Sequence, residues 1–142
     1  MNRAGLRVIV VSNQRGIGLG LYSATDVAAI HTKLQGVLKA SGAHIDAFYF
    51  CPHDEEQCNC RKPLPGMFEQ AQRDFPDITT STSAMIGDGL PDIEFGRQLG
   101  MRTVFIEGDP ETQRPGAEKA AAMADGRFAS LADAAEALLK QG

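Results

Sequence analysis

Four side chains able to bind a transition metal lie close together in the sequence: Cys51, His53, Cys58 and Cys60. They include all 3 cysteines of the chain and one of its 3 histidines. Three thiolates and an imidazole form the closed tetrahedral set that Zn²⁺ takes in structural sites. The alternatives are ordinary buried thiols, or a disulfide, which would leave one thiol over and would not account for His53. The pairing of C-x-H with C-x-C favours zinc, bound by a loop over residues 51–60.

A pair of cations follows the last of these residues. Arg61 and Lys62 come directly after Cys60, and Pro63 and Pro65 then stiffen the chain. An arginine can hold two phosphate oxygens at once, and a lysine can act as a point charge. The alternative is a solvated pair of charges. The neighbouring metal ligands favour a phosphate-binding role for this pair.

Polar side chains also follow the first predicted strand, a β-branched run over residues 6–11. The next four residues are Ser12, Asn13, Gln14 and Arg15. Ligands of open parallel sheets bind beyond the carboxyl ends of the strands, so these side chains are candidates to hold phosphate or sugar oxygens. The glycines that follow do not complete a dinucleotide fingerprint, because Leu21 occupies the position of its third glycine. The alternatives are a mobile glycine turn and, for Ser12, a hydrogen bond at the strand end.

Two carboxylates mark the end of a later strand. A short apolar run over residues 83–86 leads into Gly87 and Asp88, and Asp92 follows in the next turn. Carboxylate oxygens are the hard ligands that Mg²⁺ prefers, so we expect Asp88 to bind magnesium. Asp92 either supports that metal from its second shell of ligands or begins the next helix, where the dipole favours a negative charge.

The hydrophobic pattern predicts an α/β fold with a doubly wound parallel sheet, in a single domain over residues 1–142. Strands are expected over residues 6–11, 45–50, 83–86 and 102–106. Helices are expected to begin at Ser23, where Asp26 completes a capping box, at Met67 and at Ser130. Residues 107–126 contain two prolines and predict a loop with a partial helix.

Each predicted helix has an apolar face that we expect to pack on the sheet. These faces consist of Val27, Ile30, Leu34, Val37 and Leu38 in the first helix, Phe68, Ala71 and Phe75 in the second, and Leu131, Ala134, Ala135, Leu138 and Leu139 in the third.

Composition excludes some classes of partner. The net charge of −4 and the pI near 5.3 argue against nucleic acid. No apolar run approaches the ~18 residues of a membrane span, and the N-terminus lacks the features of a signal peptide. Reduced thiols fit a cytoplasmic protein. The sequence carries no signal for oligomeric state.

Three motifs together resemble the haloacid dehalogenase superfamily: Ser12-Asn13-Gln14, the stretch 51–66, and Gly87-Asp88. From Gly5 to about Ile106, the chain is similar to the histidinol-phosphatase-like subfamily, which includes the D-glycero-D-manno-heptose 1,7-bisphosphate phosphatases. The resemblance implies a Rossmann-like fold. It also implies a Mg²⁺-dependent phosphatase that hydrolyses a sugar phosphate, most simply heptose 1,7-bisphosphate to heptose 1-phosphate, through an aspartyl-phosphate.

The same resemblance implies a role for each site residue. Ser12 and Lys62 would act on the transferring phosphoryl group, and Asp88 would bind Mg²⁺. The remaining substrate contacts would come from Asn13, Gln14, Arg15 and Arg61. Zn²⁺ would be held by Cys51, His53, Cys58 and Cys60.

One part of the superfamily pattern is absent from the sequence. The nucleophile and the general acid–base are an Asp-x-Asp pair on the first strand, and the chain contains no Asp-x-Asp. Residues 2–5 contain a cation followed by glycine, as at the end of a helix. We therefore expect that a β-α unit of ~30 to 40 residues is missing upstream, through a late start codon or a truncated gene. Without that central strand, we expect no turnover and a loss of ladder partners for its neighbours.

Other functions remain open at this point. The absent Asp-x-Asp favours a catalytically inactive phosphate-sugar binder for the chain as it stands. A histidinol-phosphate phosphatase would use the same motifs. A zinc-clip interaction module is a third alternative, but the predicted strands and Gly87-Asp88 argue against it.

Overall fold

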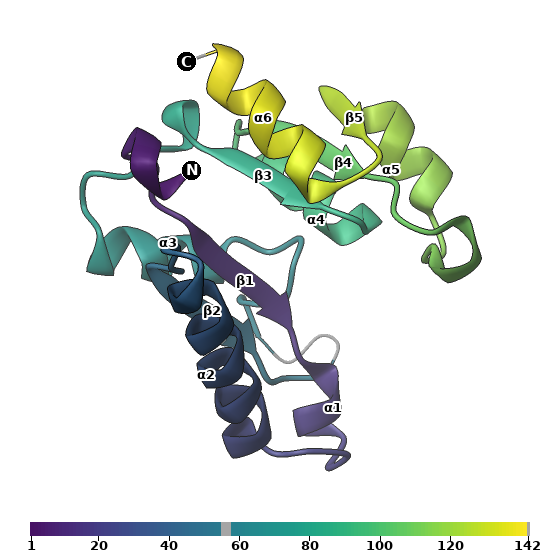
Figure 1. Cartoon of the computed structure of the whole chain (residues 1–142). Helices are drawn as coiled ribbons and strands as arrows, with labels where there is room; N and C mark the ends of the chain where they lie inside the picture. Colours follow the sequence, from purple (N-terminus) through teal and green to yellow (C-terminus); the bar gives the residue numbers. More distant parts are fainter. Residues whose placement is uncertain (55–57, 142) are drawn as a thin grey trace. The chain divides into compact units, whose positions relative to one another are not determined.

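The computed structural model describes residues 1–54 and 58–141 (Figure 1). The chain divides into two compact units, Met1–Asp74 and Phe75–Gly142. Every strand pairing among the described residues is parallel, and the strands form one two-stranded and one three-stranded sheet. The predicted α/β class with parallel strands is therefore confirmed. No helix in the described ranges is long and apolar enough to cross a membrane.

The sheet of the first unit pairs β1 (Ile9–Asn13) with β2 (Ala47–Cys51). Its register places Ser12 opposite Phe50 and Asn13 opposite Cys51. The predicted strand over residues 6–11 was thus placed too early, because pairing with β2 carries β1 through the polar residues that follow the apolar run. β1 is also half-buried rather than buried.

Two predicted helix ends in this unit are confirmed. A short 3₁₀ helix, η1 (Asn2–Ala4), ends at Gly5, whose φ of 76° is left-handed. The long helix α2 (Ala24–Ala40) begins with a complete capping box. Ser23 Oγ accepts from the Asp26 amide at 3.1 Å, and the Asp26 carboxylate accepts from the Ser23 amide at 2.8 Å.

The predicted apolar face of α2 is partly wrong. Val27 is buried and Leu38 is half-buried. The other three members are exposed by 65%, 40% and 60%, in the order Ile30, Leu34, Val37. The spacing of the apolar residues predicted that the face with Ile30, Leu34 and Val37 is buried. The face that is buried in the structure lies one residue further along the helix and includes His31, Gln35 and Leu38.

Polar side chains fill the buried stripe of α2. The His31 ring stacks on Phe48 of β2, with ring centroids 4.2 Å apart, and burial lowers the pKa of His31. The Gln35 amide accepts from the Ile45 amide at 2.8 Å and donates to the Ile45 carbonyl at 2.7 Å. Because the Gln35 amide is paired at both ends and the His31 ring stacks on an aromatic ring, these residues can face the sheet in place of leucine.

The helix after the zinc loop is α3 (Gly66–Asp74). Phe68 and Ala71 are buried, as predicted, whereas Phe75 lies beyond the helix and is half-buried. Tyr49 of β2 donates its hydroxyl to the Asp74 carboxylate at 2.6 Å. Burial, with the neighbouring Asp74, raises the pKa of Tyr49 to about 12. This hydrogen bond fastens the end of α3 to β2.

The second unit orders its strands β3-β4-β5: β3 (Ala84–Gly87), β4 (Arg102–Ile106) and β5 (Gly126–Phe128). Its helices are η2 (Thr80–Thr82), α4 (Leu90–Gln98), η3 (Pro110–Thr112), α5 (Ala117–Met123) and α6 (Leu131–Gln141). A buried cluster joins α4, β4 and α5, and consists of Ile93, Phe105, Ala117 and Ala120.

Sequence analysis missed β5 and misjudged part of α6. β5 begins at a glycine and has only three residues, so it carries no strand pattern of its own. In α6, Ala134 is buried and Ala135 and Leu138 are half-buried, as predicted. Leu131 and Leu139 are 56% and 40% exposed, so the predicted face is too wide.

A polar contact connects β4 to the chain that enters β5. Thr103 donates its amide and its hydroxyl to Asp125 Oδ2, at 2.8 and 2.9 Å, and its hydroxyl accepts from the Asp125 amide at 3.1 Å. The two hydrogen bonds from Thr103 lower the pKa of the Asp125 carboxyl. The ionised carboxylate therefore stabilises this corner of the second unit.

We expect Asp125→Ala to lower the free energy of unfolding by about 1 kcal/mol at neutral pH, since solvent screens this exposed carboxylate. The folded pKa lies below the unfolded value of 3.8. The contribution is therefore complete above that value and is lost as pH falls through the folded pKa. Urea unfolding of both proteins at several pH values checks this. A difference that stays constant into acid would contradict the role of the charge.

Candidate functional site

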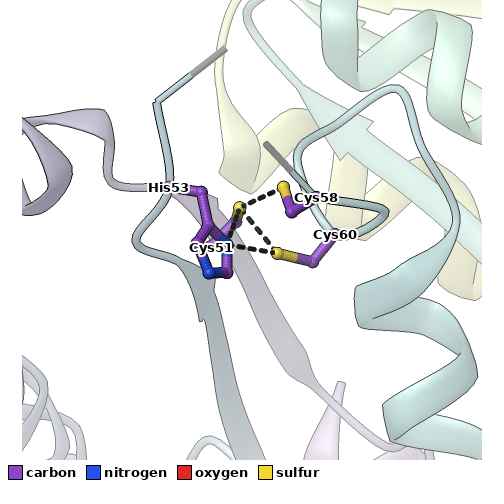
Figure 2. A group of neighbouring side chains, drawn as sticks. All are labelled: Cys51, His53, Cys58 and Cys60. Atoms are coloured by element: carbon purple, nitrogen blue, oxygen red, sulfur yellow. Dashed lines mark hydrogen bonds between the residues drawn. The ribbon is translucent and has the colours of Figure 1, made fainter. Parts of the chain in front are cut away.

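The four predicted zinc ligands converge at the carboxyl end of β2 (Figure 2). All their ligand atoms lie within 4.8 Å of one another. Cys51 Sγ is 2.7 Å from Cys60 Sγ and 3.3 Å from Cys58 Sγ, and His53 Nδ1 is 3.3 Å from Cys60 Sγ. All three cysteines are free thiols. Residues 55–57 of the predicted loop lie outside the described part of the chain.

The donor set of this cluster fits Zn²⁺. Burial opposes ionisation of Cys58, but hydrogen bonds with Cys51 and with the backbone of Arg61 and Cys60 outweigh it and lower its pKa to about 6. Burial and the neighbouring sulfurs raise the pKa of Cys60, and burial raises that of Cys51. Three thiolates this close repel one another, and a divalent cation with affinity for sulfur removes that cost.

A tight turn leads out of the cluster. The Gly66 amide donates to the Asn59 carbonyl at 2.9 Å, and the Leu64 amide donates to the Arg61 carbonyl at 2.8 Å. A Cβ on Gly66 would lie 2.8 Å from Cys60 Cα, so glycine is required there. The turn holds Arg61 and the residue after it directly beside the predicted zinc ligands.

Lys62 is buried against β1 rather than solvated. The residue is only 9% exposed, and its Nζ donates to the Val11 carbonyl at 2.9 Å. A buried ammonium is stable only with close polar partners. The charge of Lys62 is therefore fixed on β1 at Val11, the residue that directly precedes the predicted phosphate-binding Ser12.

Asn13 holds the backbone of Lys62. Its Oδ1 accepts from the Lys62 amide at 2.8 Å, and its Nδ2 donates to the Lys62 carbonyl at 3.2 Å. This reciprocal pair spans 49 residues of sequence. Asn13 therefore positions the backbone of Lys62. The predicted contact of Asn13 with substrate stays a prediction.

Gln14 links Ser12 to an aromatic residue that sequence analysis did not consider. Gln14 Nε2 donates to Ser12 Oγ at 2.7 Å. On its other side, Gln14 Oε1 accepts from the Tyr22 hydroxyl at 2.6 Å. The three side chains form one hydrogen-bonded row that ends at Ser12.

Arg15 and the short helix α1 (Arg15–Gly18) lie against the start of the zinc loop. Arg15 forms an ion pair with Asp54. A Cβ on Gly18 would lie 2.9 Å from the Pro52 carbonyl oxygen, so the two backbones are in close contact. Gly16 and Gly18 lie in the helical turn of α1. The predicted contact of Arg15 with substrate stays a prediction.

Arg61 has a donor without an acceptor. Its Nη1 is buried and has no hydrogen-bond partner among the described residues. A buried donor left unpaired costs free energy, more so when the group is charged. An oxyanion at this position would satisfy it.

In the second unit, Asp88 and Asp92 differ in their surroundings. The Asp88 side chain is 60% exposed, and its Oδ2 lies 4.0 Å from Nε of Arg114. Asp92 is buried and accepts from the Gly89 amide at 3.0 Å, at the start of α4. A Cβ on Gly87 would lie 2.4 Å from Asp92 Cβ, so glycine is required beside it.

Asp88 therefore fits Mg²⁺ better than Asp92 does. It is an exposed carboxylate directly after β3, and Mg²⁺ keeps several waters while binding one or two carboxylates. The Asp92 carboxylate lies in the first turn of α4 and accepts from the amide of the N-cap residue Gly89, which agrees with its predicted role at the start of that helix. Its part in the second shell of a magnesium site stays a prediction.

Tyr22 and Arg114 are the site residues that sequence reasoning missed. Neither belongs to a metal-binding or strand-end motif, and each contacts a partner at least eight residues away in the sequence. The spacing of glycines around Leu21 was the one available signal for Tyr22, because glycines permit a tight return of the chain.

Comparisons with a family model and with known proteins point to the same family. A family model described as HAD-hydrolase-like matches residues 59–134. The D-glycero-alpha-D-manno-heptose-1,7-bisphosphate 7-phosphatase of Mycobacterium bovis is 39% identical over 125 residues, 87% of this chain and 64% of the relative. The D-glycero-beta-D-manno-heptose-1,7-bisphosphate 7-phosphatase of Bordetella bronchiseptica is 32% identical, over 75% of this chain and 60% of the relative. The chain thus spans less than two thirds of these relatives.

A solved structure matches nearly the whole chain. The D,D-heptose 1,7-bisphosphate phosphatase from Bordetella bronchiseptica, complexed with magnesium and phosphate, aligns with a TM-score of 0.83 at 30% identity. The alignment covers 99% of this chain and 78% of that chain. The fold and the family therefore agree with the resemblance carried by the sequence motifs.

Proposed function

Because this chain belongs to the haloacid dehalogenase-like hydrolase family, we propose that it is the phosphate- and metal-binding part of a Mg²⁺-dependent phosphatase. The substrate is a sugar phosphate monoester. The preferred candidate is D-glycero-D-manno-heptose 1,7-bisphosphate, hydrolysed to heptose 1-phosphate, since the curated relatives described above carry that activity in their names.

One observation supports this proposal above the others: the buried ammonium of Lys62 fixed at the carboxyl end of β1. Ser12 directly follows Val11, the acceptor of Lys62, in β1, and Arg61 contributes a buried donor with no partner among the described residues. A hydroxyl and a fixed cation on one strand, with a second cation next to it in the sequence, match the charge and the hydrogen-bonding needs of a phosphate.

Each of these residues has a separate role in phosphoryl transfer. Ser12 donates a hydrogen bond to the phosphoryl group, and Lys62 opposes the charge that develops on its oxygens. Asp88 would hold Mg²⁺, the metal on which the proposed phosphatase depends. The attacking carboxylate is not one of these residues, because the sequence contains no Asp-x-Asp.

We further propose a role for the zinc loop, a single domain for residues 1–142, and the cytoplasm as the location of the protein. Zn²⁺ bound by the three cysteines and His53 orders the segment that presents Arg61 and Lys62. Residues 1–142 belong to a single phosphatase domain and lack its Asp-x-Asp unit. Its free thiols suit the reducing cytoplasm.

The proposal is tested by release of inorganic phosphate in the presence of Mg²⁺. The chain is assayed as it stands and with an N-terminal extension that carries the Asp-x-Asp strand and helix of a relative. Both anomers of heptose 1,7-bisphosphate are supplied, with histidinol phosphate as the alternative substrate. We expect turnover of the heptose only by the extended protein.

The other outcomes separate the alternatives. Preference for histidinol phosphate would reassign the substrate, and phosphate binding without turnover by either protein would favour an inactive binder. Equal turnover by both proteins would show that the nucleophile lies elsewhere in the chain.

A further inference from the structure

Tyr22 lies in a position that no phosphate-binding motif accounts for. From the row Tyr22–Gln14–Ser12 we infer that Tyr22 is a positioning residue: it orients the Gln14 amide so that Ser12 presents its hydroxyl proton to the phosphoryl group. This inference rests on the proposed function of Ser12.

The direction of each hydrogen bond carries the inference. The Gln14 amide can only accept through Oε1 and only donate through Nε2. The Tyr22 hydroxyl donates to Oε1 at 2.6 Å, which turns Nε2 toward Ser12 Oγ at 2.7 Å. Ser12 therefore accepts from Gln14, and its own proton stays available for another acceptor.

A flipped Gln14 amide would have the opposite effect. Ser12 would then donate its proton to Oε1 and would face a phosphate with lone pairs alone. A hydroxyl has a single proton to donate, and phosphate oxygens at neutral pH are mainly acceptors. A phenol donates a hydrogen bond more strongly than it accepts one, so the Tyr22 hydroxyl favours the observed orientation of Gln14, in which Ser12 keeps its proton for an anion.

The backbone fixes both ends of the row. The Gln14 amide nitrogen donates to the Cys51 carbonyl at 2.8 Å, which continues the pairing of β1 with β2. Beyond α1, Gly20 has a φ of 71°, and the Leu21 amide donates to the Gly16 carbonyl at 2.8 Å. This tight return carries the next residue, Tyr22, back over the start of α1.

Gly16 is shaped to receive the Tyr22 ring. A Cβ on Gly16 would lie 2.1 Å from Tyr22 Cε1, so any larger residue would displace the ring. Gly16 is buried beneath it, although Tyr22 itself is 38% exposed. The ring is therefore held by contact with backbone, and its hydroxyl is directed at Gln14.

The test compares the intact chain with Tyr22→Phe, which removes only the hydroxyl. Two readouts are measured by ¹H–¹⁵N NMR: water exchange of the Gln14 side-chain NH₂, and the Kd for inorganic phosphate in a titration. We expect faster exchange at Gln14 and about three- to tenfold weaker phosphate binding, as one hydrogen bond to a charged ligand is misdirected. Gly16→Ala, which displaces the ring but keeps its hydroxyl, should act in the same direction.

Tyr49→Phe is the matched control. It also removes one tyrosine hydroxyl with a hydrogen-bond partner, Asp74, and should lower thermal stability without changing the Kd for phosphate. Unchanged Gln14 exchange in Tyr22→Phe would overturn the inference whatever the intact chain binds. Altered exchange with an unchanged Kd would overturn it as well. An intact chain that binds no phosphate would overturn the proposed function, and with it the role of this row.

Discussion

Replacing Lys62 with alanine is expected to reduce kcat by about 10²- to 10³-fold, the usual loss for one preorganised contact to charge in a transition state. KM should rise much less. The reason lies in where the ammonium is fixed: it donates to the Val11 carbonyl, and Asn13 holds the backbone of the same residue. The charge is in place before the phosphoryl group arrives. The measurement is steady-state kinetics of the protein extended by the Asp-x-Asp unit.

Two further variants make this result specific. Arg61→Ala should raise KM more than it lowers kcat, because Arg61 is assigned to recognition of the substrate. Lys140→Ala removes the same group from an exposed ion pair with Glu136 and should change neither constant. An unchanged kcat in Lys62→Ala would show that its assigned role is wrong.

The intact, reduced chain is expected to bind about one Zn²⁺, and Cys58→Ser is expected to release it. The remaining ligands leave the tetrahedral set incomplete, and the free energy of metal binding no longer supports the loop. Metal analysis after dialysis gives the stoichiometry, and thermal unfolding with and without a chelator gives the stability. Zinc should stabilise the intact chain and leave Cys58→Ser unaffected.

The histidines provide a matched pair for this experiment. His53→Gln should also release zinc, because its Nδ1 lies among the sulfurs. His44→Gln removes an exposed imidazole that pairs with Asp46, and should retain the metal. An intact protein without zinc would argue decisively against the metal site.

Local signals in the sequence predicted local structure well. The Ser23–Asp26 capping box, the glycine end of η1 and the convergence of the four candidate metal ligands are all present in the structure. Each depends on residues close in sequence, whose spacing fixes their geometry. The parallel strands also follow from short apolar runs separated by helices.

Contacts between distant segments were not predictable in the same way. The pairing of Asn13 with Lys62 joins residues 49 positions apart, and no pattern in either segment indicates it. On α2, the spacing of Ile30 and Val37 predicted that they face the sheet. Both are exposed, and His31 packs on the sheet instead. The burial of such a residue depends on which distant segment packs against it, and a single sequence does not show that.

The central claim is that the phosphoryl group is bound between Ser12 and Lys62 at the carboxyl end of β1. A crystal structure of the zinc-loaded chain with tungstate, a phosphate analogue located by its anomalous scattering, tests it most directly. We expect a tungstate whose oxygens accept hydrogen bonds from Ser12 Oγ and Lys62 Nζ. Tungstate found only at other positions would contradict it.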